Sequence, residues 1–216
     1  MNKTDLKLYA ITDRQWLHGA RLSEHVKLAI EGGATMIQIR DKDILSTDSD
    51  AGLKDEYNEA LEIKRICHEH KVPLIINDNV QFAIDIDADG VHLGQDDMNP
   101  AEARKLLGTD KIIGVTAKTV EQAKRAEADG ADYLGSGAVF GSTTKLNAKP
   151  MTKELLREIT AAVDIPVVAI GVINADNAVT LKGTGIAGIA VVGAIFASAD
   201  IKDAAKELAE ICDKIL

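Results

Sequence analysis

The stretch IIGVTAKTVEQAKRAEADGADYLG, residues 112–135, contains one full unit of the pattern that decides the fold. An apolar run, Ile112–Thr116, precedes an amphipathic segment, Val120–Asp129, and a second apolar run, Tyr133–Gly135, follows it. Gly130 stands just after the amphipathic segment, where a helix commonly ends in a left-handed residue. The stretch therefore predicts a strand, a helix and a second strand that lies parallel to the first.

The same unit recurs from one end of the chain to the other. The apolar runs are rich in Val and Ile and mostly do not alternate with polar residues, as is typical of strands buried on both faces. Eight such runs predict a closed (β/α)8 TIM barrel, formed as a single domain over residues 1–216. The runs are Leu6–Thr12, Thr35–Arg40, Pro73–Asn77, Gly90–Leu93, Ile112–Thr116, Tyr133–Gly135, Pro166–Ile170 and Gly188–Val192. Helices are expected at Ser23–Glu31, Glu56–His70, Val120–Asp129, Thr152–Ala162 and Ile201–Leu216.

The composition excludes several classes of partner. The 216 residues carry a net charge of −9, and only 3% of them are aromatic, so neither nucleic acid nor an anionic membrane is an expected ligand. The amino terminus lacks the pattern of a signal peptide, and no apolar run reaches the ~18 residues of a membrane span. Cys67 and Cys212 are expected to be buried or half-buried thiols in a reducing compartment. The expected location is the cytoplasm.

Polar side chains gather after the strands, where barrels of this type bind their ligands. Gln38, Arg40 and Lys42 alternate with period two at the end of the second run, so they are expected to point to one side. Arg binds phosphate through two parallel hydrogen bonds, and Lys adds a mobile positive charge. The three predict a diphosphate site, and the alternative is a set of solvated charges beside Asp41 and Asp43.

Two carboxylates end neighbouring strands. Asp78 follows the third run and Asp97 follows the fourth, and adjacent strands lie about 5 Å apart. Close carboxylates repel each other unless a proton or cation separates them, and Mg²⁺ typically takes one or two carboxylates together with phosphate oxygens. The pair therefore predicts a magnesium site. Two alternatives stay open: Asp78 as the N-cap of a helix over Asn79–Asp85, and Asp96 as the ligand in place of Asp97.

A second anion site is predicted on the other side of the barrel. The loop Ser142–Lys145 combines hydroxyls with a cation between glycines, and Gly171 and Gly193 end the seventh and eighth strands. Backbone N–H groups there can approach a phosphate closely, and this corner is the usual phosphate site of the fold. No general base or nucleophile stands out, and His92 is open to a structural or a catalytic reading. The pattern fits displacement of a diphosphate by positioning and charge stabilisation.

Six phrases of the sequence occur in the order of one known family. They are LYAITDR (8–14), GGATMIQIRDKD (32–43), PLIINDNVQFAI (73–84), ADGVHLGQDDM (88–98), IIGVTAKTVEQAKRAEADGADYLGSGAVFGSTTK (112–145) and IPVVAIGVI (165–173). On these phrases the chain resembles the thiamine-phosphate synthase family over almost its whole length. The resemblance implies a transferase that condenses hydroxymethylpyrimidine diphosphate with hydroxyethylthiazole phosphate. The products are thiamine phosphate and diphosphate, formed by Mg²⁺-assisted dissociative substitution.

The resemblance also implies roles for individual residues. Those expected at the diphosphate are Gln38, Arg40, Lys42, Asn77 and Lys145. The expected Mg²⁺ ligands are Asp78 and Asp97. Those expected at the thiazole phosphate are Ser142, Thr144, Gly171, Val172, Val192 and Gly193, while Thr116 stands where the family usually has a Ser that contacts the substrate. The groups expected to act directly in catalysis are Arg40, Lys42, Lys145 and Thr116.

Val172 is the most consequential departure from the family pattern; Thr116 in place of Ser and Ser142 in place of Thr are mild ones. Val172 follows Gly171 where the family usually has a second glycine. A β-branched residue disfavours positive φ, so thiazole-phosphate binding should be weaker if this position needs glycine geometry.

Three other functions compete with the transferase. A thiazole tautomerase of the same fold would not need the diphosphate and metal groups. The chain could instead be a non-catalytic protein that binds a phosphate ligand, in which case Val172 would mark the loss of catalytic function. A sugar-phosphate isomerase or aldolase would use Lys42 or Lys145 and leave the aspartate pair unexplained. The implied partners are the two small-molecule substrates, and homo-oligomer formation is left open.

Overall fold

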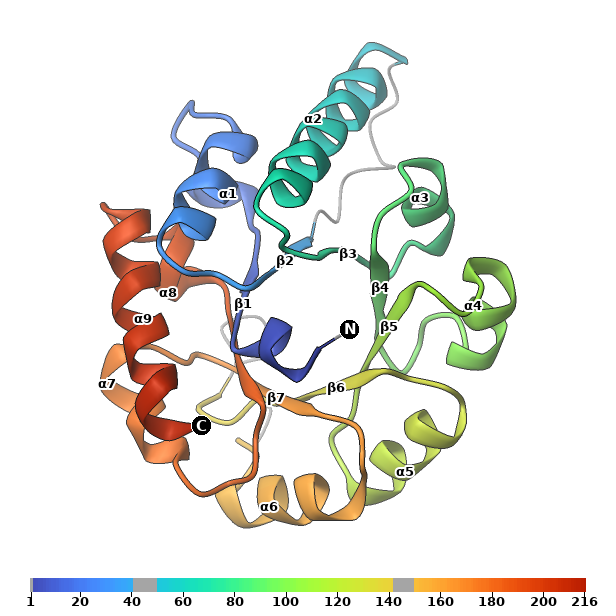
Figure 1. The fold of residues 1–216 in the computed structure, drawn as a ribbon, viewed down its shortest axis with the longest axis vertical. Coiled ribbons are helices and arrows are strands. Elements are labelled where there is room, and N and C mark those ends of the chain that lie inside the picture. Colours follow the sequence, from blue (N-terminus) through green and yellow to red (C-terminus); the bar gives the residue numbers. More distant parts are fainter. Residues whose placement is uncertain (1, 41–49, 142–149) are drawn as a thin grey trace.

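The strands of this protein close into a parallel barrel (Figure 1). The computed structural model describes residues 2–40, 50–141 and 150–216. The strands follow one another round the barrel in chain order, and β8 pairs with β1. They are β1 (Leu8–Ile11), β2 (Met36–Ile39), β3 (Leu74–Asn77), β4 (Gly90–Leu93), β5 (Ile112–Thr116), β6 (Tyr133–Gly137), β7 (Val167–Ile170) and β8 (Gly188–Val191). The predicted TIM barrel is confirmed.

Helices form a ring outside the barrel (Figure 1). They are α1 (Leu22–Glu31), α2 (Asp50–Glu69), α3 (Val80–Asp85), α4 (Pro100–Leu107), α5 (Val120–Ala128), α6 (Lys153–Ala162), α7 (Ala175–Ala178), α8 (Gly193–Phe196) and α9 (Ile201–Ile215). Three short 3-10 turns, η1 (Lys3–Leu6), η2 (Arg14–Trp16) and η3 (Val179–Leu181), complete the described elements. None of these described helices has both the length and the apolar character needed to cross a membrane.

The unit at residues 112–135 folds as its sequence predicts. Thr119 caps α5 because its side chain accepts a hydrogen bond from the Gln122 N–H. The helix ends before Gly130, which takes a positive φ of 90°. The chain then re-enters the barrel as β6, with Gly114 of β5 paired to Tyr133. Local capping and glycine geometry therefore set the boundaries of this unit.

Two expected boundaries were wrong. Leu6 lies in η1 instead of the first strand, where it is fully buried and packs into the cluster inside the barrel. The second helix begins at Asp50 instead of Glu56, so part of the expected charged loop is helical. Acidic residues favour the first turns of a helix through its dipole, which explains why the charges of this segment do not prevent a helix.

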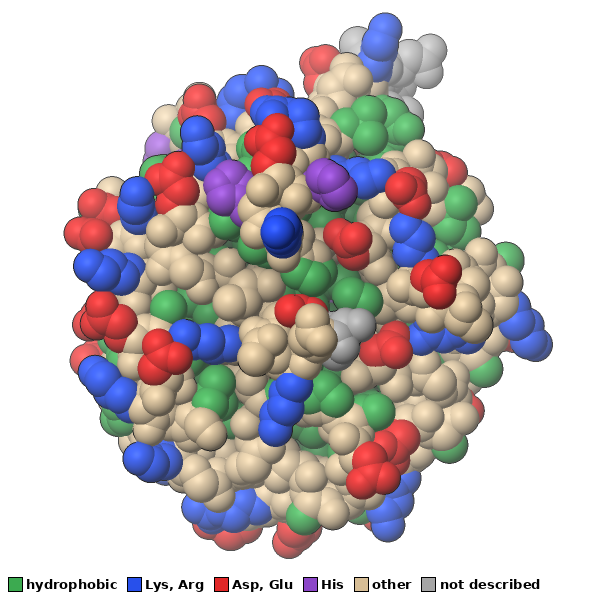
Figure 2. Space-filling view, in the orientation of Figure 1, with side chains coloured by type: hydrophobic (Ala, Val, Ile, Leu, Met, Phe, Trp, Pro, Cys, Tyr) green, Lys and Arg blue, Asp and Glu red, His purple; other side chains and the backbone are tan. Residues whose placement is uncertain are grey.

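The apolar residues form two layers on either side of the strands. Alternate strand residues point into the barrel, where Tyr9, Met36, Ile75, Tyr133 and Val168 belong to one buried cluster. The larger cluster lies between the strands and the surrounding helices and includes both cysteines, which are buried free thiols as expected. In Figure 1 the barrel is seen from the end that η1 covers. Figure 2 shows positive and negative side chains interspersed over that face, which is typical of a solvated surface and not of a binding site for a polyanion.

Two glycines make room for large polar side chains inside the barrel. A Cβ atom at Gly114 would lie 2.1 Å from Cζ of Tyr133, and one at Gly135 would lie 3.0 Å from Cε1 of His92. The register places His92, Gly114 and Tyr133 side by side on β4, β5 and β6. The Tyr133 ring fits inside the barrel because the facing position on β5 is Gly114. The His92 ring fits because the facing position on β6 is Gly135.

Replacement of Gly114 by Ala should therefore lower the free energy of unfolding by at least about 2 kcal/mol, because the new methyl group overlaps the Tyr133 ring. Urea unfolding of the two proteins would measure the loss. Gly114→Ala combined with Tyr133→Leu should cost less than the sum of the two single changes, since the shorter side chain removes the overlap. Additive costs would show that the ring does not need this space.

Candidate active site

The ends of β1 and β2 are joined by hydrogen bonds at the mouth of the barrel. The Arg40 N–H donates to Oγ1 of the buried Thr12 at 3.1 Å, and the Thr12 N–H donates to the Gln38 carbonyl at 2.9 Å. Gln38 is only 2% exposed and points into the barrel, while Arg40 is half-buried at the rim. Gln38 and Arg40 thus lie as the period-two pattern predicts. Lys42 lies outside the described residues.

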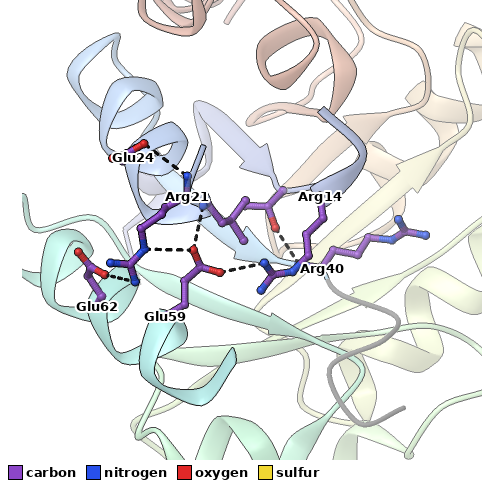
Figure 3. Close-up of polar contacts among 8 residues, drawn as sticks. Arg14, Arg21, Glu24, Arg40, Glu59 and Glu62 are labelled. Atoms are coloured by element: carbon purple, nitrogen blue, oxygen red, sulfur yellow. Dashed lines mark hydrogen bonds and ion pairs between the residues drawn. The ribbon is translucent and has the colours of Figure 1, made fainter. Parts of the chain in front are cut away.

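A buried carboxylate braces this part of the rim (Figure 3). Glu59 of α2 is 9% exposed, accepts a hydrogen bond from the Leu22 N–H at 2.9 Å and pairs with Arg14 at 2.9 Å. It also lies 3.9 Å from Arg21. Figure 3 shows Arg40 beside Arg14, with its side chain directed away from Glu59. Glu59 therefore ties the loop after β1 to α2, a role for which the sequence offers no motif.

Asp78 and Asp97 are held by backbone and side-chain hydrogen bonds at the ends of β3 and β4. The Asp78 N–H donates to the His92 carbonyl at 2.8 Å, and Nδ2 of Asn77 donates to Oδ2 of Asp78 at 2.6 Å. The Gly94 N–H donates to Oδ2 of Asp97 at 2.6 Å. The two carboxylates come from the predicted neighbouring strands and interact with each other.

This proximity changes the protonation of the pair. The pKa of Asp78 is raised to about 6, first by the partial loss of water around its carboxyl and then by the Asp97 carboxyl, while Asn77 and Arg40 oppose the shift. Asp78 therefore keeps its proton to a higher pH than an isolated aspartate does, because a second negative charge lies nearby. It is Asp97 that interacts with Asp78, which favours Asp97 over Asp96 as its partner.

The alternative role of Asp78 as a helix cap was wrong. The side chain of Asn79 accepts from the Phe82 N–H and caps α3, one residue later in the chain. Asp78 itself has a positive φ of 59°, a conformation that Asp tolerates better than most residues. The turn between β3 and α3 thus leaves the Asp78 carboxyl available at the rim.

The donor set suits a hard divalent cation. Among the described residues, no group of three or more His, Cys, Asp or Glu side chains lies close enough to hold a metal ion. A cation at Asp78 and Asp97 would therefore take its remaining ligands from water and from a phosphate, as Mg²⁺ commonly does. Two oxygen ligands that repel each other fit such an ion, which would relieve the repulsion.

A chain of hydrogen bonds crosses the barrel interior beneath the rim. Nε2 of Gln38 donates to the Tyr9 hydroxyl at 2.5 Å, which lies 2.9 Å from the Tyr133 hydroxyl. Nδ1 of His92 lies 3.0 Å from the Tyr133 hydroxyl, and its Nε2 lies 3.0 Å from Oγ1 of Thr116. We call these five residues the interior chain. It joins two residues predicted for the site, Gln38 and Thr116. The three residues between them, Tyr9, Tyr133 and His92, belong to apolar runs of the sequence.

Burial keeps the interior chain uncharged. Loss of water raises the pKa of Tyr9 and of Tyr133 well above the ordinary value of a phenol. The same cause lowers the pKa of His92 to about 4, although the charge of Asp97 opposes the shift. His92 is therefore neutral near pH 7. The sequence patterns do not single out the tyrosines, although Gly114, which lies against the Tyr133 ring, and Gly135, which lies against the His92 ring, were signals that large rings enter the barrel.

The backbone at the end of β7 is left-handed at two successive residues. Gly171 has a φ of 115°, and a Cβ atom there would lie 2.5 Å from Ala138. Val172 has a φ of 47° and a side chain that is 46% exposed, so a valine occupies a left-handed position that favours glycine. Val192 and Gly193 form the turn into α8, where Gly193 lies against Trp16. Ser142, Thr144 and Lys145 lie outside the described residues.

A hollow of about 750 Å³ lies between the loop after β1, α1 and the start of α9. It is lined by Trp16, His25, Leu28 and Phe196 among others, and none of the predicted site residues lines it. The candidate site is therefore assigned from the converging polar groups at the barrel mouth.

Comparisons with known proteins identify related sequences and a related solved structure. The sequence model of a family described as "Thiamine monophosphate synthase" matches residues 8–195. A thiamine-phosphate synthase of Ruminiclostridium cellulolyticum is 48% identical over 210 residues, 97% of each chain. Another, from Clostridium acetobutylicum, is 44% identical over 214 residues, 99% of this chain and 98% of the other. The solved thiamine phosphate pyrophosphorylase of Pyrococcus furiosus superposes with a TM-score of 0.87 at 38% identity, over 99% of this chain and 98% of that one.

Replacement of Asp78 by Asn should stabilise the metal-free protein at pH 7.5 but not at pH 4. The folded pKa of about 6 lies above the ordinary 3.8, so the wild-type fold loses stability as pH rises from about 4 to above 6. Because Asp78 is exposed, solvent screening limits the gain to about 1 kcal/mol. Urea unfolding at both pH values would measure it. The matched change Asp96→Asn should have little effect, and an equal gain at pH 4 would contradict the assignment.

Val172→Gly should raise the free energy of unfolding by about 0.5–1 kcal/mol, because relief of the left-handed strain exceeds the entropy cost of glycine. It should also leave thiazole-phosphate binding unchanged or tighter. Val179→Gly is the matched control, since Val179 is 49% exposed but has an ordinary φ of −57°. This control should destabilise the protein. Thermal unfolding and titration with thiazole phosphate measure both effects, and a large loss of binding in Val172→Gly would show that the site has adapted to valine.

Proposed function

The chain belongs to the thiamine monophosphate synthase family and is a transferase of thiamine biosynthesis, and from this premise we propose that its reaction takes place at the mouth of the barrel. The substrates proposed are hydroxymethylpyrimidine diphosphate and hydroxyethylthiazole phosphate, and the products are thiamine phosphate and diphosphate. The observation that carries this proposal is the convergence of Arg40, Asn77, Asp78 and Asp97 at the ends of β2, β3 and β4.

The diphosphate of the pyrimidine substrate is proposed to bind between Arg40 and the aspartate pair. The Arg40 guanidinium offers a planar, permanently charged donor, and the hydrogen bond from its N–H to Thr12 holds its backbone in place. Asn77 Nδ2 already donates to Asp78 and can turn to a phosphate oxygen. Lys42 and Lys145 are proposed to add charge at the same group.

Asp78 and Asp97 are proposed to hold Mg²⁺. When bound, the ion supplies positive charge that stabilises the departing diphosphate. The raised pKa of Asp78 supports this proposal, because a divalent cation between two close carboxylates would relieve their repulsion. The residues of the rim then orient the substrate so that the bond to diphosphate breaks.

The thiazole phosphate is proposed to bind at the ends of β7 and β8. Contacts from Ser142 and Thr144 and from the backbone of Gly171, Val172, Val192 and Gly193 would hold it. The left-handed backbone of Gly171 and Val172 at the end of β7 supports this placement, since successive turns of this kind can direct main-chain N–H groups at an anion. The thiazole nitrogen would then capture the pyrimidine carbocation left by the departure of diphosphate.

This reaction makes little demand for a general base. The two tyrosines lie within the barrel and keep their protons near pH 7, and the buried His92 is neutral there. Positioning and charge stabilisation therefore account for catalysis in this proposal. The same proposal includes a cytoplasmic, single-domain enzyme of residues 1–216 with two small-molecule substrates.

Activity should require Mg²⁺, and Arg40→Ala or Asp97→Ala should lower turnover at least about tenfold, equivalent to roughly 1.4 kcal/mol of barrier. One assay with both substrates, scored for thiamine phosphate and diphosphate with and without a chelator, measures this. Asp96→Ala and Arg65→Ala are matched controls, because Asp96 is exposed beside Asp97 and Arg65 pairs only with Glu69 on the surface of α2 among the described residues. Full turnover in excess chelator would exclude the metal from the mechanism.

A further inference from the structure

The direction of each hydrogen bond in the interior chain follows from its first member. The amide nitrogen of Gln38 can only donate, so the Tyr9 hydroxyl accepts from it. The single proton of the Tyr9 hydroxyl then points to its other neighbour, the Tyr133 oxygen, 2.9 Å away. Tyr133 therefore accepts a hydrogen bond from Tyr9. Its own proton is left to donate to its other neighbour.

The same logic fixes the state of the histidine. The Tyr133 proton is directed at Nδ1 of His92, which must therefore be unprotonated and accept. The imidazole is then neutral with its proton on Nε2, and this N–H donates to Oγ1 of Thr116, 3.0 Å away. Burial of the ring agrees with a neutral state. The last proton of the chain, on the Thr116 hydroxyl, has no acceptor among the described residues.

We propose that the interior chain fixes the Thr116 hydroxyl as a hydrogen-bond donor directed at the substrate in the barrel mouth. In this proposal Tyr9, Tyr133 and His92 are positioning residues, because they act through Thr116. The inference rests on the proposed function and adds to it the direction of the hydrogen bond between Thr116 and the substrate. The substrate atom in this hydrogen bond must be an acceptor.

The position of Thr116 identifies this acceptor as an oxygen of the diphosphate. The register pairs Leu93 with Val115, so Thr116 stands across from Gly94, whose N–H holds the Asp97 carboxylate. Thr116 thus adjoins the predicted metal and diphosphate residues. A donor there stabilises charge that grows as diphosphate leaves.

The surroundings hold Thr116 rigidly for this role. Nε2 of Gln95 donates to the Thr116 carbonyl at 2.6 Å, and Arg125 in turn donates to Oε1 of Gln95 at 2.9 Å. Gly114 and Gly135 give the rings of Tyr133 and His92 their space. A hydroxyl normally rotates freely. Here the Nε2–H of His92 occupies one side of the Thr116 Oγ1, so the hydroxyl proton of Thr116 is left to face the barrel mouth.

Loss of the Tyr133 hydroxyl would release this constraint. Nδ1 of His92 would have no donor, so the ring could place its proton on Nδ1 and present a bare Nε2 to Thr116. The Thr116 hydroxyl would then donate inward to His92 and turn its proton away from the substrate. Tyr133→Phe should therefore slow the reaction although it removes no group that touches substrate.

The first test is the tautomer of His92, read from the ¹⁵N chemical shifts of the imidazole in the substrate-free protein. The chain has five histidines, and His92→Gln identifies the signals that belong to His92. We expect a neutral ring protonated on Nε2, and a shift toward Nδ1 protonation in Tyr133→Phe. Tyr57→Phe is the matched control, because it removes a hydroxyl that donates to the Asp85 carbonyl outside the barrel. A wild-type ring protonated on Nδ1, or on both nitrogens at pH 7, would overturn the inference without touching the proposed function.

The second test is a double-mutant cycle on kcat with both substrates and Mg²⁺. Tyr133→Phe and Thr116→Val should each lower kcat about tenfold, and the double variant should be no slower than Thr116→Val alone. Thr116→Ser should retain most of the activity because it keeps the hydroxyl. Additive losses would show that Tyr133 acts only on the structure, and would overturn the inference.

Two further measurements keep the outcomes distinct. Circular dichroism checks that each variant folds, and Tyr9→Phe, which breaks the chain one step earlier, takes the place of Tyr133→Phe if the latter does not fold. A wild-type protein that forms no thiamine phosphate would refute the proposed function, while the tautomer measurement would still decide the direction of the chain.

Discussion

Two carboxylates held against their mutual repulsion form the constraint on which the site depends. Asp78 and Asp97 come from adjacent strands, and the hydrogen bonds from Asn77 and Gly94 keep them at the rim. The cost is visible in the pKa of Asp78, which rises to about 6. A fold can hold such a pair only on a rigid scaffold, and the closed parallel barrel provides one, since each strand end is fixed by two neighbours.

The scaffold also carries polar groups into its own interior. The interior chain occupies space that apolar side chains fill elsewhere in the barrel, and it remains uncharged because burial opposes ionisation of Tyr9, Tyr133 and His92. Tyr9, Tyr133 and His92 each have two hydrogen-bond partners within the chain. A buried network of this kind is stable when its members are paired, and its end at Thr116 falls where a substrate can complete it.

The rim, in contrast, depends on long-range contacts that no local pattern reveals. Glu59 joins the loop after β1 to α2 because the second helix packs beside the first, and its partner Arg14 is 45 residues away in sequence. Asp78 and Asp97 could be predicted to lie together because they follow two strands that were expected to be neighbours. Tyr9 and Tyr133 could not, since a tyrosine in an apolar run reads as core until the opposite side of the barrel is known.

The succession of apolar runs and helical segments in the sequence was enough to predict the number of strands and their parallel pairing. It also predicted the rim at which Gln38, Arg40, Asp78 and Asp97 lie. Periodicity and capping are local, and short crossovers leave a parallel sheet few ways to close. Only the tertiary structure decided that Asn79 and not Asp78 caps α3, that Val172 has a left-handed backbone, and that Gln38 and Thr116 are connected across the interior. These features depend on distances between strands far apart in sequence, and such distances exist only once the barrel has closed.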